Sequence, residues 1–194
     1  MELVDSQTLR NLFTAVAGEA ISYNLYSLYA RRAEADGYIQ IARVFEETAN
    51  QEKIHTEVLY RLAGGVSNPE ASLDAAMPPG VCDTLRNLNS ALREEQFRHC
   101  VMYTNFNKVA LQEGFEDIAG TLKALAKAEL YHQKRFQVLE NMLRSGHLFE
   151  KNAPILWRCS RCGFVGEFRK APEPCPVCLA GQGSFEALML NLFA

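Results

Sequence analysis

The sequence predicts a mainly α-helical fold, in which a four-helix bundle precedes a small C-terminal module of strands and loops held by cysteines. Two observations predict the bundle: apolar residues recur at helical spacing through roughly the first 145 residues, and the chain repeats itself at an offset of about 77 positions. Gly, Pro and Cys become frequent after residue 151, which predicts the module. We therefore expect a bundle domain over 1–150 and a second domain over 151–194.

Turn-forming residues divide the first part of the chain into four long helices. Gly and Pro residues mark the breaks, and the expected helices span 6–35, 38–63, 81–113 and 115–145. The connection over 64–80 is the longest, and its length would permit an exchange of helices between two subunits.

The internal repeat is a pair of helices. The segment Asp36-Gly37-Tyr38 lies over Glu113-Gly114-Phe115 at an offset of 77, and the same offset places Glu52 on Glu129. An offset of 76 places Glu19 on Glu95. Two such pairs are expected to pack so that their matching residues face the centre of the bundle.

Carboxylate and imidazole side chains recur in this repeat at metal-ligand spacing. Each half has a single glutamate followed by a Glu-x-x-His motif, and residues three apart share one face of a helix. This is the ligand pattern of ferritin-like proteins that bind two metals. The six expected ligands are Glu19, Glu52, His55, Glu95, Glu129 and His132.

Hard carboxylate ligands with imidazole suit iron or manganese. We expect Glu52 and Glu129 to bridge the two metals, and Glu19 and Glu95 to bind one metal each, with one histidine for each metal. A single Glu-x-x-His is common on exposed helices, but two motifs in register within apolar surroundings favour a buried site. Two tyrosines at matching places of the repeat are candidates to hydrogen-bond a ligand carboxylate, namely Tyr26 and Tyr103.

The C-terminal module contains two C-x-x-C pairs, which predict a tetrahedral four-thiolate metal site. The spacing suits zinc or iron and does not choose between them. Trp157 and Phe164 are the expected core of the module, and the expected ligands are Cys159, Cys162, Cys175 and Cys178. The remaining cysteines, Cys82 and Cys100, are expected to be buried apolar residues.

Composition excludes several classes of function. The net charge is -3 and the sequence pI is about 5.8, which argues against nucleic-acid binding. The sequence contains no apolar run long enough to span a membrane, and its N-terminus lacks the pattern of a signal peptide. Paired cysteines in an unexported chain indicate metal binding, so we expect a cytoplasmic protein.

The sequence resembles the rubrerythrin family over almost its whole length. The order of a di-metal bundle and a cysteine module is the same, and the matching stretches are Ala17-Gly18-Glu19-Ala20, Asp36-Gly37-Tyr38, the segment from Glu47 to His55, Glu113-Gly114-Phe115, the segment from Ala128 to Phe136, and the module from Trp157 to Cys178.

This resemblance implies a fold, cofactors and an activity. It implies a ferritin-like bundle with a di-iron centre and a rubredoxin-like module whose four cysteines bind iron. It also implies a peroxidase of the NADH-dependent type, which reduces hydrogen peroxide to water. Electrons would come from an unidentified donor protein, a rubredoxin or a reductase, and would enter through the rubredoxin-like iron. Members of the family are typically homodimers in which the module of one subunit lies near the di-iron centre of the other.

One residue departs from the pattern of the family. Three positions after Glu95 the family usually has a second glutamate, which exchanges with the first histidine as an iron ligand, whereas this chain has Arg98. Arginine cannot bind a metal. In one interpretation, His55 binds permanently and Arg98 pairs with a carboxylate such as Glu19. In the other, the cation depletes one metal position and weakens turnover.

The expected function is therefore a non-haem di-iron oxidoreductase that reduces hydrogen peroxide. Two alternatives stay open on the sequence alone. One is a ferritin-like metal-binding protein with a zinc knuckle and weak or no turnover. The other is a di-iron oxidase that reacts with dioxygen.

Overall fold

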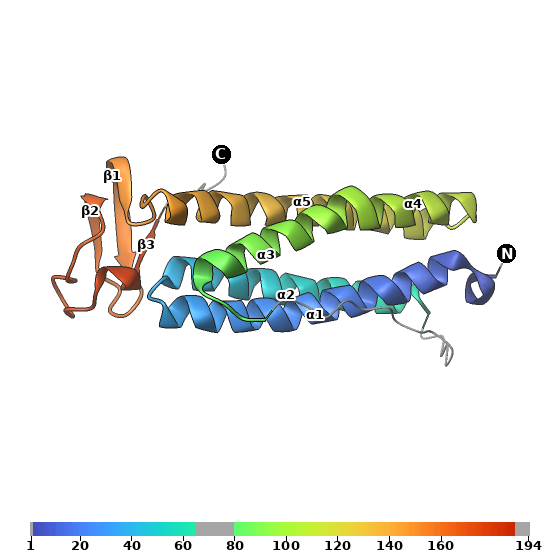
Figure 1. Ribbon diagram of the computed structural model, residues 1–194, viewed down its shortest axis with the longest axis horizontal. Helices are drawn as coiled ribbons and strands as arrows, with labels where there is room; N and C mark the ends of the chain where they lie inside the picture. The colour runs from blue at the N-terminus through green and yellow to red at the C-terminus, as the bar shows by residue number, and fades with distance from the viewer. Residues whose placement is uncertain (1, 65–79, 189–194) are drawn as a thin grey trace.

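Two helical pairs form the bundle in the computed structural model, which describes residues 2–64 and 80–188. A short 3-10 helix, η1 (Leu3–Asp5), precedes the first pair, α1 (Gln7–Ala35) and α2 (Ile39–Leu62). The second pair consists of α3 (Thr84–Phe97), the π-helical segment η2 (Arg98–Met102), α4 (Tyr103–Gln112) and α5 (Glu116–Arg144). Figure 1 shows the pairs lying along each other, with all the strands at one end.

The turns within the two pairs are built alike. Gly37 and Gly114 both have positive φ angles, of 82° and 87°, which glycine adopts without steric cost. In each turn the next aromatic residue donates its backbone N–H five residues back, Tyr38 to Ala33 at 2.8 Å and Phe115 to Ala110 at 2.8 Å. This pattern ends a helix and starts an antiparallel partner. The glycine–aromatic match in the repeat therefore specifies the same turn twice.

An acidic residue in each turn contacts the start of a helix in the other pair. The Asp36 carboxylate accepts hydrogen bonds from Thr84 N at 3.1 Å and Thr84 Oγ1 at 2.7 Å. The Glu113 carboxylate accepts from Thr8 N at 2.8 Å and Thr8 Oγ1 at 2.5 Å. Backbone N–H groups in the first turn of a helix lack intrahelical partners, and the Asp36 carboxylate satisfies one of them while the Glu113 carboxylate satisfies two, those of Gln7 and Thr8. These reciprocal contacts join the two halves of the repeat.

The third expected helix differs from the prediction. It begins at Thr84, where the side chain of Asp83 accepts a hydrogen bond from Arg86 N at 2.9 Å, and the π-helical turn of η2 interrupts it. A π-helical turn accommodates one extra residue. That extra residue explains why Glu19 matches Glu95 at an offset of 76, whereas Tyr26 matches Tyr103 at 77.

Residues 65–79, which make up most of the long connection between the second and third expected helices, lie outside the described part of the chain. The hypothesis that two subunits exchange helices depends on this connection. Among the described helices, none combines the length and the apolar character that a membrane span requires.

The C-terminal module is a three-stranded antiparallel sheet in the order β2-β1-β3, with strands β1 (Glu150–Cys159), β2 (Val165–Lys170) and β3 (Phe185–Ala187). A 3-10 turn, η3 (Gln182–Ser184), precedes β3. Trp157 is fully buried and Phe164 packs in the same cluster, as the sequence predicted. An ion pair of 2.5 Å between Arg43 of α2 and Glu186 of β3 fixes the module on the end of the bundle.

Two apolar clusters fill the bundle, and the metal-ligand candidates lie between them. Tyr26, Phe45 and Phe136 belong to the cluster nearer the strands, whereas Leu12, Leu59 and Leu122 belong to the cluster at the other end. In every long helical segment a fully buried glutamate follows residues of one cluster and precedes residues of the other. The carboxylates therefore occupy the middle of the bundle and are shielded from water at both ends.

Candidate metal centre

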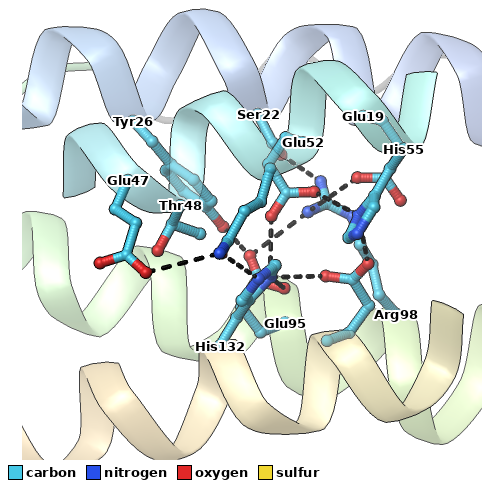
Figure 2. Close-up of polar contacts among 12 residues, drawn as sticks. Glu19, Ser22, Tyr26, Glu47, Thr48, Glu52, His55, Glu95, Arg98 and His132 are labelled. Atoms are coloured by element: carbon cyan, nitrogen blue, oxygen red, sulfur yellow. Dashed lines mark hydrogen bonds and ion pairs between the residues drawn. The ribbon is translucent and has the colours of Figure 1, made fainter. Parts of the chain in front are cut away.

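The six residues expected to bind metals converge at the centre of the bundle. Figure 2 shows side chains from α1, α2 and α3 pointing toward His132 of α5. The potential ligand atoms form two groups, within each of which all the atoms lie within 4.8 Å of one another. One group contains Glu19, Glu52, His55 and Glu129, and the other contains Glu52, Glu95, Glu129 and His132. Glu52 and Glu129 belong to both groups, which is the arrangement expected of bridging carboxylates.

The donor atoms of this cluster fit two cations. All four glutamates are 0% exposed, and one oxygen of each has no hydrogen-bond partner among the described residues: Glu19 Oε2, Glu52 Oε1, Glu95 Oε2 and Glu129 Oε1. Burying a carboxylate without compensation costs several kcal/mol, so four carboxylates buried at one point require positive charge beside them. Two divalent cations would supply it, and carboxylate with imidazole is a donor set that suits iron or manganese.

Both histidines direct their Nδ1 atoms at the shared carboxylates. His55 Nδ1 lies 3.1 Å from Glu52 Oε2 and 3.0 Å from Glu129 Oε1. His132 Nδ1 lies 3.1 Å from Glu129 Oε2 and 3.0 Å from Glu52 Oε1. Without metal, burial lowers the pKa of each imidazole, but the carboxylates outweigh this effect and raise the pKa of His55 to about 9 and that of His132 to about 12. A proton on Nδ1 thus takes the position that a metal would occupy.

Burial and neighbouring charges also shift the pKa values of the carboxylates in different directions. The pKa of Glu95 is raised to about 8 by burial and by the nearby charges of Glu52 and Glu129. Burial also raises the pKa of Glu129, but hydrogen bonds from His132 and His55 bring it down to about 2. The bridging position is therefore anionic at neutral pH even before a metal binds.

Two tyrosines hold the carboxylates that the groups do not share. Tyr26 donates a hydrogen bond from its hydroxyl to Glu95, and Tyr103 donates one to Glu19. The expectation from the repeat is therefore confirmed for both tyrosines. Burial beside carboxylates raises the pKa of both phenols well above the usual value, so each remains a hydrogen-bond donor at neutral pH.

A glutamine that the sequence analysis did not single out completes the surroundings of His132. Gln51 Oε1 lies 2.9 Å from His132 Nε2. A hydrogen bond at Nε2 places the ring proton there and leaves the Nδ1 lone pair free for a metal. The repeat gave no signal for this contact, because the position that matches Gln51 at the offset of 77 is Ala128.

Arg98 lies inside the cluster, at the first position of η2, and is 4% exposed. Its Nη1 atom lies 3.4 Å from Glu95 Oε1 and 3.7 Å from Glu19 Oε2. The pairing with Glu19, expected in one of the two interpretations, is therefore present, and Glu95 is a second and nearer partner. Arg98 Nη2 donates to the Gly18 carbonyl at 3.3 Å and to the Ser22 hydroxyl.

The four cysteines of the module form a second metal-ligand cluster. The Sγ atoms of Cys159 and Cys178 are 3.7 Å apart, as are those of Cys162 and Cys175. A tetrahedral site with metal–sulfur bonds of about 2.3 Å has edges of about 3.8 Å, so these distances fit a zinc or iron ion. The expectation that Cys100 is buried is wrong, since this cysteine is exposed on η2, and Cys82 is half-buried.

Comparisons with known proteins agree with both clusters. The family model described as "Rubrerythrin" matches residues 10–140, and the model described as "Rubrerythrin, rubredoxin-like domain" matches residues 157–186. The chain is 37% identical over 191 residues to a rubrerythrin from Nitratidesulfovibrio vulgaris, an alignment that covers 97% of this chain and 98% of that one. It is 36% identical over 186 residues to a rubrerythrin from Clostridium perfringens, with 95% of each chain covered.

A solved nigerythrin structure in a mixed-valence state has a TM-score of 0.63 and 29% identity, and the match covers 94% of this chain and 90% of that one. Mycobacterium tuberculosis bacterioferritin, at 18% identity and a TM-score of 0.62, shares the fold over 73% of this chain and 89% of its own.

Proposed function

Because this chain belongs to the rubrerythrin family, a family of oxidoreductases, we propose that it reduces hydrogen peroxide to water at a di-iron centre in the bundle. The observation that carries the proposal is the pair of ligand groups that share Glu52 and Glu129 and that place four fully buried carboxylates at one point. Such a site would hold two metals. When bound, the iron pair supplies two electrons and Lewis acidity to the peroxide oxygens.

In this proposal, Glu52 and Glu129 would be shared between the two irons, whereas Glu19 and Glu95 would each hold one. His55 and His132 would hold one iron each through Nδ1, the atom that faces the shared carboxylates. The hydroxyls of Tyr26 and Tyr103 hold the terminal carboxylates in position, and the two apolar clusters exclude bulk water. Reduction of one peroxide to two waters consumes two electrons and two protons.

We propose that the electrons enter through an iron bound by Cys159, Cys162, Cys175 and Cys178, from a rubredoxin or a reductase that ultimately uses NADH. In one subunit the module lies beyond Gln40 of α2, whereas Glu52 lies twelve residues further along the same helix. At the rise of an α-helix, Gln40 and Glu52 lie about 18 Å apart along the bundle. A homodimer in which the module of one subunit approaches the centre of the other would shorten that path. Reduced thiolates of this kind are stable in the cytoplasm, where we place the protein.

Metal content and peroxide kinetics together test this function. The chain purified without oxygen or added metal should contain about three irons, two in the bundle and one at the cysteines. Mixing the reduced protein with hydrogen peroxide in a stopped-flow instrument should oxidise the iron pair faster than mixing with dioxygen. Glu52→Gln should lose the iron pair and this reaction, whereas Glu57→Gln, on the exposed surface of α2, should retain both.

A second candidate function is a metal-binding protein without turnover, and the buried cation of Arg98 is the observation that favours it. About one iron per chain, or zinc at the cysteines with a half-filled bundle, would support that candidate and contradict peroxidase function. Equal or faster oxidation by dioxygen would instead indicate an oxidase.

A further inference from the structure

Arg98 brings a permanent positive charge into direct contact with the carboxylate cluster. Its Nη1 atom contacts one carboxylate from each ligand group, Glu95 at 3.4 Å and Glu19 at 3.7 Å. The nearby Arg135 pairs at 2.6 Å with Glu47, an exposed residue outside the cluster.

The protein holds this guanidinium in a defined position. Its second nitrogen donates to the Gly18 carbonyl and to the Ser22 hydroxyl, both on α1, and the side chain is buried. Figure 2 shows Arg98 pointing from the third helical segment toward Glu19 and Ser22. The π-helical turn begins at Arg98, three residues after Glu95, so both side chains reach the same point of the cluster. A guanidinium stays charged at every relevant pH, so its charge cannot be lost by deprotonation.

We propose that Arg98 is a built-in counter-ion of the metal centre, which stabilises the metal-free carboxylates and raises the reduction potential of the bound iron pair. The second effect rests on the proposed di-iron function. Reduction lowers the positive charge of the irons, and a fixed cation in contact with two of the ligand carboxylates favours the state with less positive charge. Net charge is a recognised determinant of potential in protein metal centres. Arg98 would therefore make the reduced pair easier to form and slower to lose electrons to weak oxidants.

The charge also matters before metal binds. Four fully buried carboxylates lie at one point, and removal of one partner from a buried ion pair is strongly destabilising because it leaves the other charge uncompensated. The metal-free protein should therefore depend on Arg98 more than the metal-loaded protein does. This second consequence provides a measurement that does not depend on iron chemistry or on activity.

Two substitutions separate charge from packing. Arg98→Gln keeps hydrogen-bond donors and removes the charge, whereas Arg98→Lys keeps the charge and changes the shape. In a redox titration of the iron-loaded protein, the potential of the di-iron pair should shift downward in Arg98→Gln and stay near wild type in Arg98→Lys. The cysteine-bound iron in the same sample is the internal control, and its potential should stay constant. In the metal-free protein, Tm should fall in Arg98→Gln and recover in Arg98→Lys.

The remaining outcomes test separately the proposed role of Arg98 as a counter-ion and the proposed di-iron function. If both variants shift the potential and the metal-free Tm equally, or if Arg98→Gln shifts neither, the charge of Arg98 is not the determinant and the inference is wrong. If Arg98→Gln does not fold while Arg98→Lys does, the charge is essential to the cluster and the inference stands. If neither folds, the role of Arg98 is packing and the inference fails. A wild-type protein that binds no iron pair contradicts the proposed function, and the metal-free Tm values still test the counter-ion.

Discussion

Gln51 Oε1 lies 2.9 Å from Nε2 of His132, on the side of the ring that faces away from the shared carboxylates. Gln51 directly precedes Glu52 in α2, so one helical turn supplies both a bridging carboxylate and the hydrogen bond that orients the histidine of the opposite helix. The two metal positions therefore differ, because the repeat places Ala128 where His55 would need an equivalent partner.

Gln51→Leu should weaken metal binding at the His132 position. Loss of the hydrogen bond at Nε2 frees the imidazole to rotate and to change tautomer, and such outer contacts typically contribute about 10–100-fold in metal affinity. Competition with a chelator, followed by metal analysis, measures the change. Gln133→Leu is the matched control, because Gln133 contacts His99 outside the cluster in the same way. Equal affinity in the Gln51 variant and the wild type would contradict the role of Gln51.

Tyr103→Phe should lower the free energy of unfolding by about 1 kcal/mol, the usual contribution of one hydrogen bond, and slow peroxide reduction by releasing Glu19. The aromatic ring and its packing are retained, so a core defect is not introduced. Tyr29→Phe is the control, because its ring is also buried and its hydroxyl makes no hydrogen bond to the carboxylate cluster. Thermal unfolding and stopped-flow oxidation give the two readouts. If the two variants have the same oxidation rate, the tyrosine does not position Glu19.

The helices and the convergence of the six candidate ligands could be predicted from the sequence because each feature occurs twice, once in each half of the repeat. Glu52 with His55 is a weak motif alone, but Glu129 with His132 repeats it in register, and the same holds for Tyr26 and Tyr103. The shared turn of glycine and aromatic residue likewise fixed the helix ends at Gly37 and Gly114.

The features that the sequence analysis missed are those in which the halves differ. The extra residue in η2 was visible only as the change of offset from 76 to 77, and that change was not interpreted as a π-helical turn. Gln51 has no counterpart, so the repeat could not indicate it. Cys100 was expected to be buried only because free cysteines usually are. Its actual exposure is set by its position on η2, where the π-helical turn shifts the helical phase.

Glu113→Gln should lower the stability of the metal-free protein at neutral pH and have no effect in acid. The hydrogen bond from the Thr8 hydroxyl, with smaller ones from the Gln7 and Thr8 backbone, holds the pKa of Glu113 below its usual value. A group whose pKa is lowered by folding stabilises the fold above its unfolded pKa of about 4.3 and loses that effect as pH falls through the folded pKa. The expected loss at pH 7 is about 1 kcal/mol, as for other helix caps.

Urea unfolding of the metal-free chain between pH 3 and pH 7 measures this difference. The carboxylate cluster titrates equally in both proteins, so subtraction isolates Glu113. Glu57→Gln on the exposed face of α2 should show no such pH-dependent difference. A constant difference across the pH range would mean that the substitution acts through packing and not through the charge.

Cys162→Ser should abolish metal binding at the module and leave the di-metal centre filled. The four sulfurs lie at the edges expected for one tetrahedral ion, and the small core around Trp157 cannot hold three short strands without it. The red absorption of ferric thiolate should disappear, the iron content should fall by one per chain, and hydrogen exchange at β1 and β2 should rise. Cys100→Ser removes another exposed thiol from the same protein and should change none of these quantities.

Slow electron delivery in Cys162→Ser, with single-turnover oxidation of the chemically reduced iron pair unchanged, would identify the module as the entry point for electrons. Unchanged steady-state turnover would show that electrons reach the bundle by another route.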